Sequence, residues 1–235
     1  MPSTTRSRKR RTRPGRVGIY GGTFNPVHVA HLILAEEMRE RFGLDRILFV
    51  PSGEPPHKRG NFPSGAQRLE MVRRAVAGNT FFSAVDIEVR RPGFSYTIET
   101  LRELRRRFPD GREFFFLIGM DAFAEITTWH RAEELLDWTH FVIFPRPGFP
   151  LEDPARYTPR TWRSAPPVRP RKGVRRFPVK GKKSLFLAEA PSLPVSASDI
   201  RRRVREGRSV TYLVPAAVEA CIRRNSLYTT RNKGG

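Results

Sequence analysis

Two histidines stand three positions apart, shortly after a pair of adjacent glycines. The glycines are Gly21 and Gly22, and the histidines are His28 and His31. Adjacent glycines permit a tight turn and a close approach of a ligand to the backbone. Side chains three apart share one face of a helical turn, so both imidazoles can meet one ligand. This arrangement predicts a site for a polyphosphate.

The neighbouring residues predict the elements that position this site. Residues 17–20 are apolar and indicate a buried strand, whereas Leu34, Met38 and Phe42 recur at helical spacing. Pro26 has a preset backbone angle that suits a first helical turn. A strand, a turn and a helix N-terminus present outward-pointing amides, and the helix dipole there favours negative charge.

Other interpretations of the histidine pair remain open. The adjacent glycines do not match the G-x-G-x-x-G dinucleotide fingerprint, and no G-K-[ST] sequence follows as in a P-loop. His28 and His31 could be two polar surface residues at a helix start. They could also be a metal-binding pair, although no third ligand from cysteine or an acidic cluster is evident.

The charge of the chain is strongly positive and unevenly distributed. The 235 residues hold 44 Lys and Arg against 23 Asp and Glu, a net charge of +21. Residues 1–16 contain seven basic groups and residues 154–183 contain eleven, with no acidic group in either segment. We therefore predict a disordered basic tail over 1–16. Prolines crowd the segment 149–183, so we expect a mobile surface loop without a helix or central strand.

Cysteine content and hydropathy limit the class of protein. Cys221 is the only cysteine, which excludes an intramolecular disulfide and a cysteine zinc cluster. The N-terminus lacks the apolar run of a signal peptide, and the longest apolar stretch, 114–120, is too short to span a bilayer. We expect a cytoplasmic protein that does not contact a membrane.

Apolar runs alternate with amphipathic runs along the chain. Strands are predicted over 17–20, 46–50, 82–89, 114–118, 140–144 and 184–187. Helices are predicted over 28–42, 65–77, 97–108, 121–137 in two pieces, 198–206 and 215–224. Such alternation predicts one α/β domain over 17–225, with a doubly wound parallel sheet and helices on both faces. The segment 149–183 is its insertion, and 226–235 is expected to be a frayed C-terminal tail.

The opening motif resembles a known family. Residues 21–31 are similar to the T/H-x-G-H signature of nucleotidyltransferases with a Rossmann-like domain, and G-G-T-F-[DN]-P-x-H most resembles the nicotinate-nucleotide adenylyltransferase family. Further blocks resemble this family in the same order, over 55–58, 95–101, 118–122 with Trp129, 146–148 and 195–201. Together they cover nearly all of 17–225.

The resemblance implies a reaction. ATP and nicotinate mononucleotide would give deamido-NAD and pyrophosphate, by in-line attack of the mononucleotide phosphate on the α-phosphorus. Catalysis would then come from alignment and from neutralising charge. The resemblance implies catalytic roles for His28, His31 and Arg201. Mg²⁺ would bind the phosphates of ATP, without metal ligands from protein side chains.

The resemblance also implies two binding sets. The ATP-binding set is Gly21, Gly22, Thr23, Phe24, His28, His31, Gly119, Asp121, Ser196, Ser198 and Arg201. The mononucleotide-binding set is Lys58, Tyr96, Thr97 and Trp129. Several of these residues have simpler roles. Ser196 and Asp199 form a capping-box pattern, Asp121 could cap the next helix, and Trp129 could belong to the core.

The chain departs from the family pattern at four positions. Asn25 stands where Asp is usual, Ala30 replaces the glycine of H-x-G-H, and Ala197 and Ser198 replace Ser and Thr. A member that binds nucleotide without turnover therefore remains open. So does an adenylyltransferase for nicotinamide mononucleotide or phosphopantetheine. Assembly into a homo-oligomer is a further open alternative. The basic segments could also bind nucleic acid non-specifically.

Overall fold

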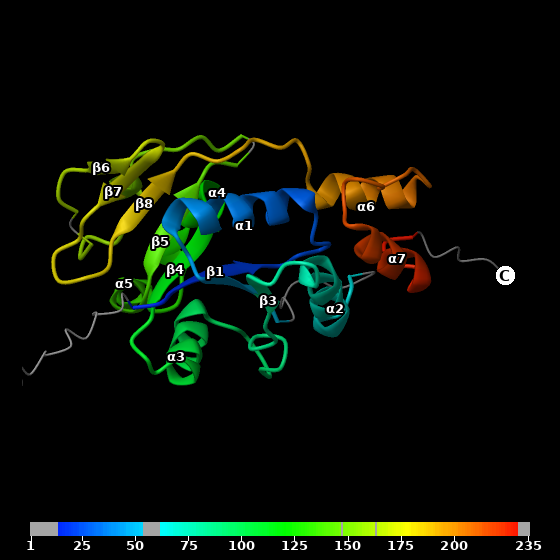
Figure 1. The fold of residues 1–235 in the computed structure, drawn as a ribbon, viewed down its shortest axis with the longest axis horizontal. Helices are drawn as coiled ribbons and strands as arrows, with labels where there is room; N and C mark the ends of the chain where they lie inside the picture. The colour runs from blue at the N-terminus through cyan, green and yellow to red at the C-terminus, as the bar shows by residue number, and fades with distance from the viewer. Residues whose placement is uncertain (1–13, 54–61, 147, 163, 230–235) are drawn as a thin grey trace, which may run out of the picture.

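A single eight-stranded sheet organises the chain in the computed structural model (Figure 1). The structure describes residues 14–53, 62–146, 148–162 and 164–229. The strands are β1 (Arg16–Gly22), β2 (Arg46–Pro51), β3 (Phe82–Ala84), β4 (Glu113–Gly119), β5 (His140–Phe144), β6 (Val168–Arg171), β7 (Val174–Phe177) and β8 (Leu185–Ala188). They lie in the order β3-β2-β1-β4-β5-β8-β7-β6.

Seven α-helices are assigned within the described residues. They are α1 (Val29–Phe42), α2 (Gly65–Val76), α3 (Thr97–Arg107), α4 (Met120–Phe123), α5 (Leu135–Trp138), α6 (Ala197–Arg205) and α7 (Ala216–Arg224). Short 3₁₀ turns lie at Ile126–Thr128, Ala132–Glu134 and Pro154–Arg156. None of these helices, in the part of the chain described, is long and apolar enough to cross a membrane.

The strand order reverses direction between β1 and β4. From β1 the chain builds outward through β2 and β3, then returns to β4 and builds the other way through β5 and β8. All of these pairs are parallel, with Val17 opposite both Arg46 and Phe114. Ligands of such sheets bind beyond the carboxyl ends of the strands at this reversal. The predicted doubly wound α/β fold is confirmed.

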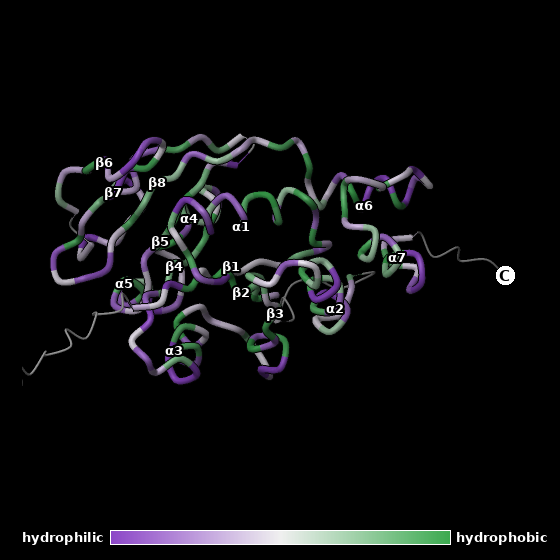
Figure 2. Tube along the Cα trace, viewed as in Figure 1, coloured by the Kyte–Doolittle hydropathy of each residue, from purple (hydrophilic) through white to green (hydrophobic). Residues whose placement is uncertain are grey.

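The two faces of the sheet carry separate hydrophobic cores because strand side chains alternate. On β4, Phe115 and Leu117 face the layer of α1, α2 and α7, whereas Phe114 and Phe116 face α3, α4 and α5. The first half of α1 is hydrophobic and its second half is hydrophilic (Figure 2). The apolar half of α1 therefore covers the end of β1 where the glycine turn lies.

The insertion 149–183 is not the featureless loop that its prolines predicted. Strands β6 and β7 form an antiparallel hairpin, and β7 pairs antiparallel with β8, so the hairpin extends the sheet. Proline is still confined to the edge of the sheet, as expected of a residue that has no backbone N–H to donate. Strand β7 contains no proline, and Pro170 lies in the edge strand β6. Trp162 is 2% exposed and donates to the Glu133 carbonyl at 3.0 Å, which anchors the insertion to the core.

The helical region predicted over 121–137 in two pieces is present as two short α-helices, α4 and α5, separated by 3₁₀ turns. Two other predictions need correction. Strand β3 ends at Ala84 instead of 89, because the chain turns where Arg90 N–H bonds the Asp86 carbonyl at 2.9 Å. The C-terminal segment is not frayed at 226–229, since Leu227 and Tyr228 are buried in the core.

Candidate active site

The histidine pair lies where β1 gives way to α1. His28 occupies the N-cap position, and its backbone N–H donates to Nδ1 of His31 at 3.2 Å. The ring centroids are 3.7 Å apart with planes inclined by 34°. Because Nδ1 of His31 accepts this bond, a neutral His31 carries its proton on Nε2. That Nε2–H is then available as a donor.

A cavity of about 80 Å³ opens beside these rings. Its walls come from the end of β1, the start of α1, the residues after β5 and the segment 191–195; they include Tyr20, Ala30, Arg146 and Leu193. The volume suits a phosphoryl group and is well below that of a site enclosing a whole nucleotide. Ala30, the departure from H-x-G-H, places its methyl group in this wall.

Four buried polar atoms have no hydrogen-bond partner within the described residues: Tyr20 Oη, His28 Nδ1, Asp121 Oδ1 and Arg146 Nε. Tyr20, His28 and Arg146 line this cavity, and Asp121 lies next to Arg146. Buried polar groups are almost always paired, and leaving one unpaired costs about 1–3 kcal/mol. Their convergence on one spot indicates a site that a polar ligand completes.

Burial keeps the two imidazoles neutral. It lowers the pKa of His28 from 6.5 to about 4, and the guanidinium of Arg146 lowers it further. The pKa of His31 is well below 6.5, first because of burial and then because of His28 and Arg146. Burial also raises the pKa of Tyr20 to about 12. At pH 7 these groups therefore act as neutral hydrogen-bonding groups.

Arg146 lines the cavity beyond the end of β5, and Asp121 lies next to it beyond the end of β4. Arg146 Nε lies 3.7 Å from Asp121 Oδ1, which is an ion pair without a hydrogen bond. Gly119 makes room for both, since a Cβ at this position would lie 2.8 Å from Arg146 Nε and would also collide with Asp121. The structure thus brings the predicted residues Gly119 and Asp121 together with Arg146, which belongs to a block that resembles the family but was not predicted as a site residue.

Helix α6 brings Arg201 to the same turn from a distant part of the chain. Arg201 Nη1 donates to the Asn25 carbonyl at 2.8 Å, and Nη2 donates to Ser198 Oγ at 3.2 Å. Ser196 caps the helix by accepting from Asp199 N–H at 3.1 Å. The Asp199 carboxylate instead pairs with two arginines of its own helix, so the reciprocal capping box is not formed.

The turn between β1 and α1 is also held from the opposite side. Phe24 has a φ of +46° and is buried against Tyr20 and Phe49, so its place in the turn depends on packing. Arg68 of α2 is fully buried and donates to the carbonyls of Thr23 at 2.8 Å and Gly53 at 2.9 Å. Arg68 lies on the apolar face of α2. A charged residue at an apolar position of a helix was the sequence feature that could have indicated its role.

The predicted mononucleotide residues gather near the start of α3. Tyr96 is the N-cap residue of α3, and its ring centroid lies 4.4 Å from that of His130. Trp129 meets Phe116 edge-on at 6.1 Å, so it packs partly against the core. Thr97 begins the helix. Lys58 lies outside the described residues, and His130 is a neighbour that the sequence analysis missed.

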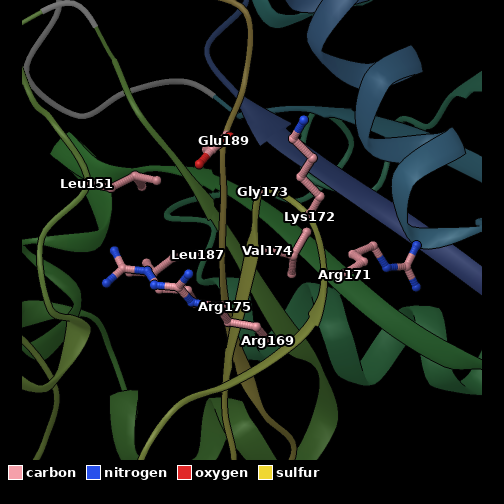
Figure 3. A pocket seen from close by; sticks show the side chains of 9 residues that line it. All are labelled: Leu151, Arg169, Arg171, Lys172, Gly173, Val174, Arg175, Leu187 and Glu189. Atoms are coloured by element: carbon pink, nitrogen blue, oxygen red, sulfur yellow. The ribbon is translucent and has the colours of Figure 1, made fainter.

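A larger cavity of about 440 Å³ lies in the basic hairpin, away from the histidine pair. Its lining includes Arg169, Lys172, Arg175 and Glu189 (Figure 3). None of the residues predicted as catalytic or binding contributes to it. Among the described residues, no group of three or more His, Cys, Asp or Glu side chains is placed to hold a metal ion.

The sheet reversal, the glycine turn and the unpaired donors at its edge define a nucleotide-binding α/β protein of the nucleotidyltransferase class. The cytidylyltransferase-like family model matches residues 19–203. A probable nicotinate-nucleotide adenylyltransferase of Desulfitobacterium hafniense is 41% identical over 216 residues, covering 92% of this chain and 96% of the relative. One of Geobacter metallireducens is 44% identical over 216 residues, covering 91% and 98%. The chain belongs to the nicotinate-nucleotide adenylyltransferase family.

A solved structure has a similar fold. The nicotinic acid mononucleotide adenylyltransferase of Plasmodium falciparum, complexed with NaAD, matches with a TM-score of 0.69. The match covers 91% of this chain and 97% of that protein at 18% identity. At this identity the likeness bears on the fold alone.

Proposed function

We propose that this chain transfers the adenylyl group of ATP to nicotinate mononucleotide, giving deamido-NAD and pyrophosphate. Its family membership supports the reaction. The observation that carries the assignment to this site is the convergence of polar atoms without hydrogen-bond partners among the described residues, from Tyr20, His28 and Arg146, on one small cavity. A phosphoryl group accepts hydrogen bonds on every oxygen and suits such a lining.

The chemistry requires alignment more than activation. A phosphate oxygen of the mononucleotide forms a bond to the α-phosphorus while the bond from that phosphorus to the bridging oxygen of pyrophosphate breaks. The attacking oxygen is already anionic, so no proton has to be removed. The protein must hold the two phosphates in line and stabilise the charge that develops on the leaving group.

The proposed roles follow from the charges of the site. Neutral His31 can donate from Nε2, and His28 can bond a phosphate oxygen through its unpaired ring nitrogen. Positive charge comes from Arg146 on one wall and from Arg201 on α6. Asp121 is proposed to accept a ribose hydroxyl, and the amides of the turn over 21–24 to meet the phosphates.

Magnesium is proposed to arrive with ATP. The polar side chains that line the cavity are ones that can donate, and the described residues provide no cluster of metal ligands, so the phosphate oxygens of ATP would hold the ion. When bound, Mg²⁺ neutralises charge on the departing pyrophosphate. For the second substrate we propose Tyr96, Thr97 and Trp129 as the mononucleotide site, with the Tyr96–His130 ring contact at its edge.

The direct test is an acceptor assay. The purified chain is incubated with ATP, Mg²⁺ and nicotinate mononucleotide, and deamido-NAD is measured by chromatography together with pyrophosphate. Parallel reactions contain nicotinamide mononucleotide or phosphopantetheine, and a further reaction contains EDTA. We expect deamido-NAD as the main product and no product with EDTA. Product with phosphopantetheine alone, or with no acceptor, refutes the proposed function.

The hairpin favours a second, separate function. Arg169, Lys172 and Arg175 line one cavity, and none of them forms an ion pair within the described residues. We propose that this surface binds nucleic-acid phosphates without sequence specificity and with a steep salt dependence. Arg169→Glu with Arg175→Glu should abolish the binding of a labelled RNA strand and leave catalysis unchanged. Arg156→Glu is the matched control, because Arg156 is exposed and pairs with Glu152.

A further inference from the structure

The C-terminal segment reaches back to the glycine turn. Tyr228 is 3% exposed, and its hydroxyl donates to Asn25 Oδ1 at 2.7 Å across 203 positions of sequence. Leu227 beside it is buried in the core and donates its N–H to the Ile222 carbonyl at 3.0 Å. This segment follows α7 and is therefore fixed against the same layer as α1. The hydrogen bond to Asn25 therefore links this tyrosine directly to the turn.

Asn25 connects this tyrosine to Arg201. The Asn25 side chain accepts from Tyr228, whereas its backbone carbonyl accepts from Arg201 Nη1 at 2.8 Å. Both bonds occupy oxygen atoms of Asn25. An oxygen turned toward a bound phosphate would repel it, so engaging both oxygens elsewhere favours an anion beside the turn.

The hydrogen bond from Tyr228 also fixes the orientation of the Asn25 side-chain amide. An amide group has an acceptor oxygen and a donor nitrogen at opposite ends, so fixing Oδ1 on a hydroxyl donor also fixes Nδ2. Within the described residues, Asn25 Nδ2 donates no hydrogen bond. Burial raises the pKa of Tyr228, which keeps its hydroxyl protonated and able to donate. The arrangement leaves two N–H donors on a turn already suited to phosphate.

We propose that Tyr228 is a positioning residue for adenylyl transfer. Through Asn25 it holds the turn over 23–25 and the Arg201 contact in place, and it leaves Asn25 Nδ2 as an additional donor to a phosphate of ATP. This inference rests on the proposed function. It gives the substitution of Asn for the usual Asp a specific consequence, since an aspartate would accept from Tyr228 but offer no donor.

The test compares Tyr228→Phe with Tyr212→Phe. Tyr212 is 89% exposed on the loop before α7, so it controls for loss of a hydroxyl near the C-terminus. For Tyr228→Phe we expect kcat/KM for ATP to fall about tenfold, which corresponds to about 1.4 kcal/mol, with KM for nicotinate mononucleotide unchanged. Tyr212→Phe should match the unmodified chain. Equal activity of the two variants overturns the proposal.

Substitutions at Asn25 separate positioning from binding. Asn25→Asp keeps an acceptor for Tyr228 but loses the donors, so we expect normal folding and a raised KM for ATP. In an Asn25→Ala background, Tyr228→Phe should cause no further loss, whereas an additive loss overturns the coupling. Urea unfolding of each variant identifies any that fail to fold. If the Asn25→Ala variants fail to fold, the KM of Asn25→Asp for ATP decides, and an unchanged KM overturns the proposed donor role of Asn25.

A calorimetric arm keeps the inference separate from the proposed function. The affinity for ATP with Mg²⁺ is measured for the unmodified chain and for Tyr228→Phe. If the unmodified chain makes no deamido-NAD, the proposed function fails, and the affinity ratio still reports on Tyr228. A ratio near one then refutes the positioning role, and a tenfold weakening supports it.

Discussion

The buried histidine pair should make the protein sensitive to mild acid. The pKa of His28 is 6.5 in an unfolded chain and about 4 in the fold, because of burial and then Arg146. Above pH 6.5 the side chain is neutral in both states and its contribution to stability is fully present. As the pH falls from 6.5 to 4, only the unfolded chain binds the proton, so the free energy of unfolding decreases. The full loss is about 3 kcal/mol, and about 2 kcal/mol of it is reached by about pH 4.5.

This loss is measured by urea unfolding at about pH 7 and about pH 4.5, monitored by tryptophan fluorescence. His28→Gln cannot take up the proton, so its free energy of unfolding should decrease by about 2 kcal/mol less than that of the unmodified chain over this range. His140→Gln is a useful comparison, because burial also lowers the pKa of His140 to about 4 at a site far from the cavity. An identical pH dependence for the unmodified chain and His28→Gln would refute the assignment of a neutral, buried imidazole. ATP should raise the pKa of His28, which a nuclear magnetic resonance titration can follow.

Three further outcomes concern the cavity. His31→Ala should lower turnover at least about tenfold with little effect on folding, as measured by steady-state kinetics alongside circular dichroism. Arg146→Met should raise KM for ATP by at least about tenfold and move the pKa of His28 back toward 6.5, because a positive neighbour is removed. Gly119→Ala should destabilise the fold by about 1–3 kcal/mol in urea, since the added methyl would meet Arg146 and Asp121.

The sequence predicted the parts of this protein in which apolar residues repeat at the spacing of a strand or a helix. Phe114 to Ile118 alternate between two cores, and Leu34 and Met38 repeat along one helix face, so the strands and helices of the sheet were recognisable. The histidine pair was recognisable because its members are close in sequence. Their contact at 3.7 Å is set by a single turn of backbone.

The parts that escaped prediction depend on contacts between distant residues. Arg146 meets the histidines only because β5 lies beside β4 in the sheet, and its signal was a charge placed just after an apolar strand. The hairpin β6–β7 was hidden because prolines were counted over the whole insertion, although β7 has none. Tyr228 was assigned to a frayed tail because nothing local shows that its hydroxyl reaches Asn25.

The charges of the site form a consistent set once these contacts are included. Neutral imidazoles contribute no positive charge before ATP binds, so the fixed positive charge beside the turn, among the described residues, comes from arginines: Arg146, Arg201 and the buried Arg68. A carboxylate at position 25 would offset one of them, whereas Asn25 does not. The departure from the usual Asp therefore leaves the phosphate site more positive rather than impaired. Together with four buried polar atoms that have no hydrogen-bond partner in the described part of the chain, this argues that the site still binds an anion, and the acceptor assay then decides whether binding leads to turnover.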